Sequence, residues 1–102
     1  MKVQSLKQSP RVAANLDGHI LYSGGINEVV HLQLKAGEEL EPHQNPLDAI
    51  FYCIEGQAIL IVDSQEFVIQ QDDCIQIPSV AERSWKNTGE GNLRLLVIKQ
   101  KI

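Results

Sequence analysis

Apolar and polar residues alternate in short segments along most of this chain. The clearest case is residues 28–34, where Val30, Leu32 and Leu34 share one face and polar side chains share the other. The continuous apolar run at 58–62 predicts a strand buried on both faces. Further segments rich in β-branched and apolar residues predict strands at 19–22, 49–54, 66–69, 74–77, 84–86 and 93–98.

Turn residues separate these segments at short intervals. They stand at 23–25, 35–39, 55–56 and 63–64. No stretch of ten or more residues shows a clean helical repeat of 3.6, and any helix in the N-terminal segment 1–16 would be short. Short strands with turns between them predict an all-β sandwich or barrel.

The composition limits the size and the partners of this fold. A length of 102 residues predicts one domain, residues 1–102, with a modest core. The net charge is −4 and the nine Lys and Arg are scattered, which argues against a nucleic-acid partner. No apolar segment approaches membrane-spanning length, and the N-terminus lacks the apolar core of a signal peptide. We therefore expect a soluble cytoplasmic protein without a membrane partner.

The two cysteines do not form a CxxC pair. We predict that Cys53 and Cys74 are buried structural thiols. A disulfide is disfavoured by the expected cytoplasmic location. The other alternative is a thiol in a ligand pocket, and alternation along its strand points Cys53 inward.

Two groups of residues carry a family resemblance. The first group is Gly37, His43, Asn45, Ala49 and Gly56. The second group is Asp72, Pro78, Val80, Arg83 and Asn87. In order and spacing these groups resemble motif one (37–56) and motif two (72–87) of the cupin superfamily. The resemblance implies an all-β cupin fold, the double-stranded β-helix or jelly-roll barrel, which hosts many activities. It also implies a homodimer, which would cover apolar sheet faces and strand edges.

The chain departs from the family at the metal-binding positions. Metal-dependent cupins hold iron, manganese, zinc or nickel with three histidines and a glutamate, and here only His43 remains, with Asn45, Ala49 and Arg83 at the other positions. A guanidinium stays protonated and cannot ligate a metal, and its charge repels a cation. We therefore expect no cofactor. A divalent transition metal would need Arg83 turned out to solvent or substitute ligands, such as His43 with Asn45 or His31.

The inward positions of the motif strands predict a ligand pocket instead. Alternation points six candidate ligand-binding residues inward: His43, Asn45, Phe51, Cys53, Arg83 and Trp85. Apolar walls with a few convergent polar groups are typical of small-molecule pockets. The planar fork of Arg83 suits a carboxylate or phosphate, and Trp85 is able to stack on a planar or sugar-like ligand. We predict that the protein binds a small polar or anionic metabolite.

Two other interpretations stay open from the sequence. The protein is an enzyme if His43 acts as a general base beside Arg83, as in a metal-free isomerase or epimerase, or if a rebuilt metal site supports oxygenase or isomerase chemistry. It is a vestigial barrel with an oligomeric or regulatory role if Arg83 pairs internally with Asp48 or Glu55 and Trp85 belongs to the core.

Several motif residues also have purely structural interpretations. Gly37 and Gly56 are predicted turn residues, and Asp72, which stands where the family has glycine, is predicted to be left-handed. We expect the side chain of Asn87 to bond the backbone near the second motif. His31 has no motif support and is interpreted as a surface or hydrogen-bonded strand residue.

Overall fold

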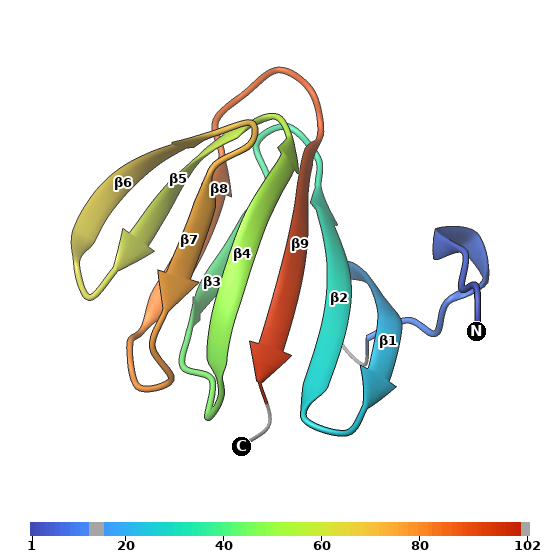
Figure 1. Cartoon of the computed structure of the whole chain (residues 1–102). Coiled ribbons are helices and arrows are strands. Elements are labelled where there is room, and N and C mark those ends of the chain that lie inside the picture. The colour runs from blue at the N-terminus through green and yellow to red at the C-terminus, as the bar shows by residue number, and fades with distance from the viewer. Residues whose placement is uncertain (13–15, 101–102) are drawn as a thin grey trace.

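Within residues 1–12 and 16–100, which the computed structural model describes, nine β-strands form two antiparallel sheets (Figure 1). The strands are β1 (Asp17–Gly24), β2 (Asn27–Leu34), β3 (Glu39–His43), β4 (Asp48–Glu55), β5 (Gln57–Val62), β6 (Gln65–Gln70), β7 (Cys74–Ile77), β8 (Arg83–Asn87) and β9 (Leu93–Gln100). One sheet has the order β1-β2-β9-β4-β7 and the other has the order β3-β8-β5-β6. The all-β prediction is confirmed.

The hydrophobic core lies between the two sheets. Val30, Leu32 and Leu34 of β2 are buried on one face, as predicted. They stand opposite three buried residues of β9, which are Val97, Leu95 and Leu93. Each such side chain contributes about 1.5–3 kcal/mol when it is fully buried. The period-two alternation of the sequence therefore gathers these apolar side chains on one face of their sheet.

The apolar run in β5 is buried on one face, so the prediction of burial on both faces is wrong. Ala58 and Leu60 are buried against the other sheet. Ile59 and Ile61 point the other way and are half-buried. A continuous apolar sequence gave no sign of this difference, because both faces of the strand are apolar.

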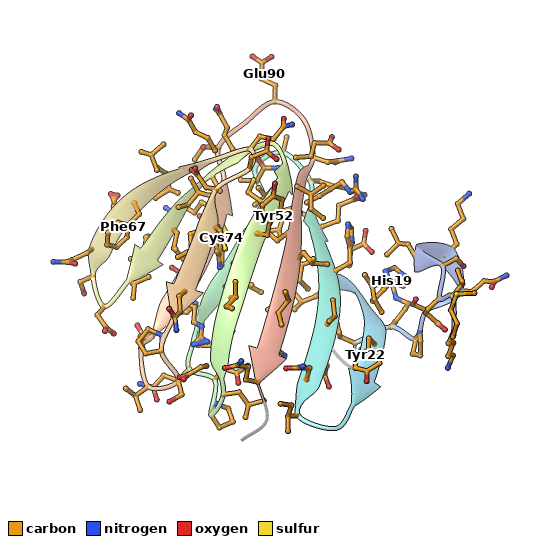
Figure 2. The ribbon with its side chains drawn as sticks, viewed as in Figure 1. His19, Tyr22, Tyr52, Phe67, Cys74 and Glu90 are labelled. Carbon is orange, nitrogen blue, oxygen red and sulfur yellow. The ribbon has the colours of Figure 1, made fainter. Side chains whose placement is uncertain are left out.

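The prediction for the cysteines is right for Cys53 and wrong for Cys74. Cys53 is fully buried, whereas Cys74 is exposed. Cys74 begins β7, the edge strand of its sheet, and pairs with Tyr52 of β4. Both residues lie on the outer face of that sheet (Figure 2). The alternation that turns Cys53 inward therefore turns Cys74 outward.

The sequence pattern did not predict strand β3. The segment Glu39–His43 contains Pro42 and two glutamates, which are residues depleted from strands. β3 is an edge strand that pairs only with β8. An edge strand tolerates proline because one row of its N–H groups needs no partner in the sheet. This strand matters for function because it ends at a candidate site residue, His43.

Three motif residues adopt left-handed backbone conformations, which was predicted for Asp72 and agrees with the turn role predicted for the two glycines. Their φ angles are +82° at Gly37, +95° at Gly56 and +72° at Asp72. At Gly56 a methyl group would lie 2.6 Å from the backbone oxygen of Asn92, whereas at Gly37 it would meet nothing within 4 Å. Gly56 is thus required for close packing as well as for its backbone conformation.

The N-terminal segment contains a short 3-10 turn, η1 (Leu6–Gln8), which lies away from the sheets (Figure 1), and Arg11 forms an isolated β-bridge with His19. The expectation of no more than a short helix in residues 1–16 holds for the described part, and residues 13–15 lie outside it. Val12 and Leu16 return to pack against the core. No helix in the described part of the chain is long and apolar enough to cross a membrane.

Candidate functional site

One end of the sandwich contains a partly open cavity of about 160 Å³, lined by residues from both sheets. Its polar lining residues are His43, Asn45, Arg83 and Lys99. They come from the end of β3, the β3–β4 loop, the start of β8 and the end of β9. The rest of the wall is apolar and consists of Val12, Leu16, Val30, Leu32, Leu40, Ala49, Phe51 and Val97. Antiparallel pairing brings these strand ends to the same end of the fold.

Arg83 is the deepest charged residue of this cavity. Only 1% of its surface is exposed. Its Nη1 donates to the backbone oxygen of Ala81 at 3.3 Å, and its Nε has no partner among the described residues. Burial lowers the pKa of Arg83 from its usual value, but a guanidinium keeps its proton in proteins. Arg83 is therefore a buried cation with incomplete hydrogen bonding, which is a costly arrangement.

The carboxylates predicted as internal partners of Arg83 are engaged elsewhere. Asp48 Oδ1 accepts a hydrogen bond from the backbone N–H of Ser79 at 2.8 Å. Glu55 Oε1 lies 3.5 Å from Nη1 of Arg94. No ion pair to Arg83 is present within residues 1–12 and 16–100. The expectation of an internal Arg83 salt bridge with Asp48 or Glu55 is therefore wrong for the described structure.

His43 faces Arg83 across the β3–β8 pair. The two residues are direct register partners, and His43 is exposed. Its Nδ1 lies 3.1 Å from the backbone oxygen of Glu41. A carbonyl oxygen only accepts hydrogen bonds, so this contact places a proton on Nδ1 and leaves Nε2 of a neutral ring as an acceptor. His43 thus offers the cavity a polar group that can accept a proton or a hydrogen bond.

Asn45 and Lys99 complete the polar lining. Asn45 Oδ1 accepts from the backbone N–H of Leu47 at 2.9 Å, which leaves its amide donors for a ligand. Lys99 Nζ lies 3.9 Å from Glu28 Oε1, so its charge has a carboxylate neighbour. The sequence interpretation missed Lys99 because it lies outside both motifs. Its position two residues after the inward Val97 was the signal that could have identified it.

Two of the six predicted ligand-binding residues lie in the core and do not line the cavity. Trp85 is fully buried, and its ring centroid lies 5.1 Å from that of Phe51. Cys53 is also fully buried, and burial raises the pKa of its thiol, which keeps it protonated and unreactive. Phe51 is the only one of these three that lines the cavity in the described structure. The structure therefore brings His43, Asn45, Phe51 and Arg83 together at one site.

The indole Nε1 of Trp85 also lacks a partner among the described residues. A buried neutral N–H without a partner costs less than a buried charge in the same state. Because Trp85 does not line the cavity, we assign its Nε1 no part in ligand binding.

The residues at the four family metal positions do not fit a divalent cation. Arg83 is buried and lines the same cavity as His43, so it is not turned out to solvent. Ala49 offers no donor atom, and the oxygen of Asn45 is occupied by the backbone. The site therefore combines one imidazole with a fixed positive charge. That set favours an anion and disfavours the family's metal.

The substitute ligand His31 does not reach this cavity. It alternates with Val30 and Leu32, which do line the cavity, so its side chain lies on the outer face of β2. Its Nε2 accepts a hydrogen bond from Nε of Arg94 at 3.1 Å. His31 is buried and hydrogen-bonded, as its structural interpretation predicted. Among the described residues no cluster of three or more His, Cys, Asp or Glu could hold a metal.

Comparisons with known proteins identify the fold. A family model for the cupin domain matches residues 30–99. An RmlC-like cupin from Shewanella frigidimarina has a TM-score of 0.84 and 15% identity, over 100% of this chain and 92% of that chain. An RmlC-like cupin family protein from Methanocaldococcus jannaschii, with a double-stranded β-helix fold, has a TM-score of 0.84 and 18% identity, over 99% of this chain and 91% of that chain. The polyketide cyclase RemF from Streptomyces resistomycificus has a TM-score of 0.84 and 13% identity, over 100% of this chain and 80% of that chain. No match is found among curated protein sequences.

Proposed function

Because the chain belongs to the cupin family and its barrel contains a buried guanidinium that has no carboxylate partner among the described residues, we propose that it binds a small anionic metabolite without the family's metal. The observation that carries the proposal is Arg83, which is 1% exposed, lines the cavity and has an unpartnered Nε. A buried charge needs an opposite charge and hydrogen bonds. A carboxylate or phosphate supplies both to the planar fork of an arginine.

The neighbours of Arg83 support the same proposal. Asn45 has free amide donors, and His43 has a ring nitrogen that can accept a hydrogen bond from a ligand hydroxyl. Eight of the twelve residues that line the cavity in the described structure are apolar, so a ligand that fills it displaces water from around Arg83. Exclusion of water strengthens each electrostatic contact that the ligand makes.

The first test combines metal analysis with ligand-induced stabilisation. Untagged protein purified without chelator is measured for iron, nickel, manganese and zinc, and we expect far less than one equivalent. Thermal unfolding is then followed with small carboxylates and with inorganic phosphate. An anion at 100 times its Kd stabilises the protein by about 2.7 kcal/mol, which raises Tm by roughly 10 °C in a domain of this size.

Arg83→Met and Lys86→Met form a matched pair for this test. Both substitutions remove one positive charge from β8, but Lys86 is exposed and points away from the cavity. We expect Arg83→Met to abolish the stabilisation by the anion and Lys86→Met to retain it. Near-stoichiometric metal, or stabilisation that persists in Arg83→Met, would overturn the proposal.

A metal-free isomerase or epimerase is the second candidate, and one observation favours it. The contact of His43 Nδ1 with the Glu41 carbonyl leaves Nε2 as a potential base across from Arg83. Exchange of the ligand's α-proton in D₂O, followed by NMR, tests this candidate. Exchange that His43→Gln abolishes would establish the catalytic role, and no exchange above the buffer rate would restrict the protein to binding.

Three expectations about the protein's surroundings stay predictions. The homodimer is tested by light scattering coupled to size-exclusion chromatography. The cytoplasmic location is tested by cell fractionation. The absence of a nucleic-acid partner is tested by a gel-shift assay at low salt, where electrostatic binding is strongest.

A further inference from the structure

The charges around the cavity limit the charge of its ligand. Three of the twelve lining residues are basic and none is acidic within the described structure. Lys99 already has Glu28 as its neighbour, at 3.9 Å. Arg83 is the buried basic residue that lacks a carboxylate partner among the described residues. One negative charge on the ligand therefore completes the site, and a second would be buried without a partner.

The apolar wall sets the character of the rest of the ligand. Val30, Leu32, Leu40 and Val97 are buried side chains from both sheets that line the cavity. A polar ligand body against these side chains would lose its hydrogen bonds to water without replacement. An apolar body gains affinity there, by about fourfold for each methylene group that is buried.

The volume of the cavity sets the size of that body. A volume of about 160 Å³ is close to that of an engineered apolar cavity of about 150 Å³ in another protein, which holds one benzene molecule. A body of about six carbon atoms therefore fills the space. The part of a longer chain or a fused ring system that exceeds this volume would extend toward the open side of the cavity, where the exposed His43 lies, and would gain less from apolar burial.

From these three constraints, and resting on the proposed function, we infer that the ligand is a small monocarboxylate with a compact apolar body of about six carbon atoms. Its carboxylate binds Arg83 and its body packs against the aliphatic side chains and Phe51. This assignment separates it from inorganic phosphate, dicarboxylates and sugar phosphates, which also carry the oxygens that a guanidinium recognises.

The test is a calorimetric titration of the full chain with a graded set of ligands at constant ionic strength. The set contains acetate, 2-methylpropanoate, 4-methylpentanoate and benzoate, with glutarate and inorganic phosphate as doubly charged probes. Benzamide is the neutral control that keeps the shape of benzoate. We expect Kd to fall by about fourfold per added methylene and to be at least about tenfold higher for glutarate, phosphate and benzamide.

Variants at two positions test where the carboxylate and the apolar body of the ligand bind. Arg83→Met should weaken benzoate by at least about tenfold, and Arg83→Lys, which keeps the charge, should recover part of that loss. Ala49→Leu adds a side chain to the cavity wall at a buried position. It should weaken benzoate by at least about tenfold while acetate changes by less than about twofold.

The outcomes distinguish a failure of the monocarboxylate assignment from a failure of the proposed anion site. Tighter, Arg83-dependent binding of glutarate or phosphate would overturn the monocarboxylate and leave the anion site in place. Binding of benzamide as tight as that of benzoate, unchanged in Arg83→Met, would overturn the anion site as well. If no anion of the set binds, both fail. Because the ligand series is measured on the unaltered protein, the result stands even if a variant does not fold.

Discussion

The two ends of strand β8 treat a buried polar residue in opposite ways. At its last residue, Asn87 is 4% exposed and all of its side-chain groups are used. Its Nδ2 donates to the backbone oxygens of Leu34 and Gly91, at 3.0 and 2.8 Å. Its Oδ1 accepts from the backbone N–H of Gly89 at 2.9 Å. These bonds join β2, β8 and the β8–β9 loop, and they confirm the backbone role predicted for Asn87.

At the first residue of the same strand, Arg83 is buried more deeply and has fewer partners. Among the described residues it makes one hydrogen bond, of 3.3 Å to the backbone oxygen of Ala81, and it carries a full charge. Both residues point to the same side of the strand, so burial alone does not distinguish them. The two residues differ in the number of hydrogen bonds that their side chains complete. The side chain of Asn87, whose hydrogen bonds are complete, holds the fold together. The guanidinium of Arg83 is incompletely bonded, carries a charge and lines the cavity, and it is the group that we propose binds a ligand.

The largest expected effect comes from removing the side chain of Asn87, whose hydrogen bonds are complete. Asn87→Ala leaves two backbone oxygens and one N–H without their partner. The bond to the Leu34 oxygen is buried, whereas the two bonds to the β8–β9 loop are part-buried, and an unsatisfied buried group costs about 1–3 kcal/mol. We expect a loss of about 3 kcal/mol in the free energy of unfolding, measured by urea denaturation with an unchanged m-value. Lys86→Ala, an exposed neighbour, should change it by less than about 0.5 kcal/mol. A loss below about 1 kcal/mol in Asn87→Ala would contradict the structural role.

A second effect concerns the backbone at this end of the fold. Gly56→Ala places a methyl group against the carbonyl of Asn92 at a positive φ, so we expect a loss of about 2–3 kcal/mol. Gly37→Ala has the same strain but open space, so we expect about 1 kcal/mol. Thermal and urea unfolding of the pair measure the difference. Equal losses in the two variants would show that the close contact at Gly56 relaxes without cost.

The third effect has the opposite sign and concerns the unsatisfied end. Arg83→Met replaces an unpaired buried charge by an apolar side chain of similar length. In a buffer without small carboxylates or phosphate we expect a gain of about 1 kcal/mol in the free energy of unfolding. The measurement is urea denaturation of both proteins at the same ionic strength. A loss of more than about 1 kcal/mol would mean that Arg83, like Asn87, holds the fold together. It would contradict the difference in role between the two residues.

The smallest effect concerns a third buried polar residue. Burial and then the charge of Arg94 lower the pKa of His31 below its ordinary value of 6.5. As the pH falls, the His31 side chain therefore takes up a proton at a higher pH in the unfolded chain than in the folded protein. The contribution of His31 to stability is present above pH 6.5 and is lost as the pH falls from there toward its folded pKa. Tm measured from pH 8 to 5 should fall more for the natural protein than for His31→Gln, and equal slopes would contradict this assignment.

The alternation in the sequence predicted which way side chains point, but not how deep they lie. Val30 and Arg83 were placed on the correct faces because the side chains of a strand alternate strictly. Trp85 points the same way as Arg83, yet it lies further along the strand, where the sheets are packed together. Depth along the barrel depends on contacts between distant strands, and one strand's sequence does not contain them.

The sequence also did not predict which charged residues form ion pairs. Glu55 was a reasonable partner for Arg83, but the register of β4 with β9 brings it to Arg94 instead. Lys99 entered the cavity wall because β9 continues past Val97 in the same alternation. A motif fixes the spacing within a segment. Which charges meet is decided by pairing between segments that are far apart in the chain.

Two walls of the cavity, Val12 and Leu16, precede the first strand and belong to neither sheet. Every rung of hydrogen bonds between the strands would remain if either side chain changed. Substitution of either residue would therefore change the shape of the cavity while the strand pairing stays in place, at the cost of the contacts that these two side chains make with the core. Related barrels with the same strand register could accept differently shaped ligands through a few substitutions in this leading segment. A comparison of barrels by their strands alone would not reveal that divergence.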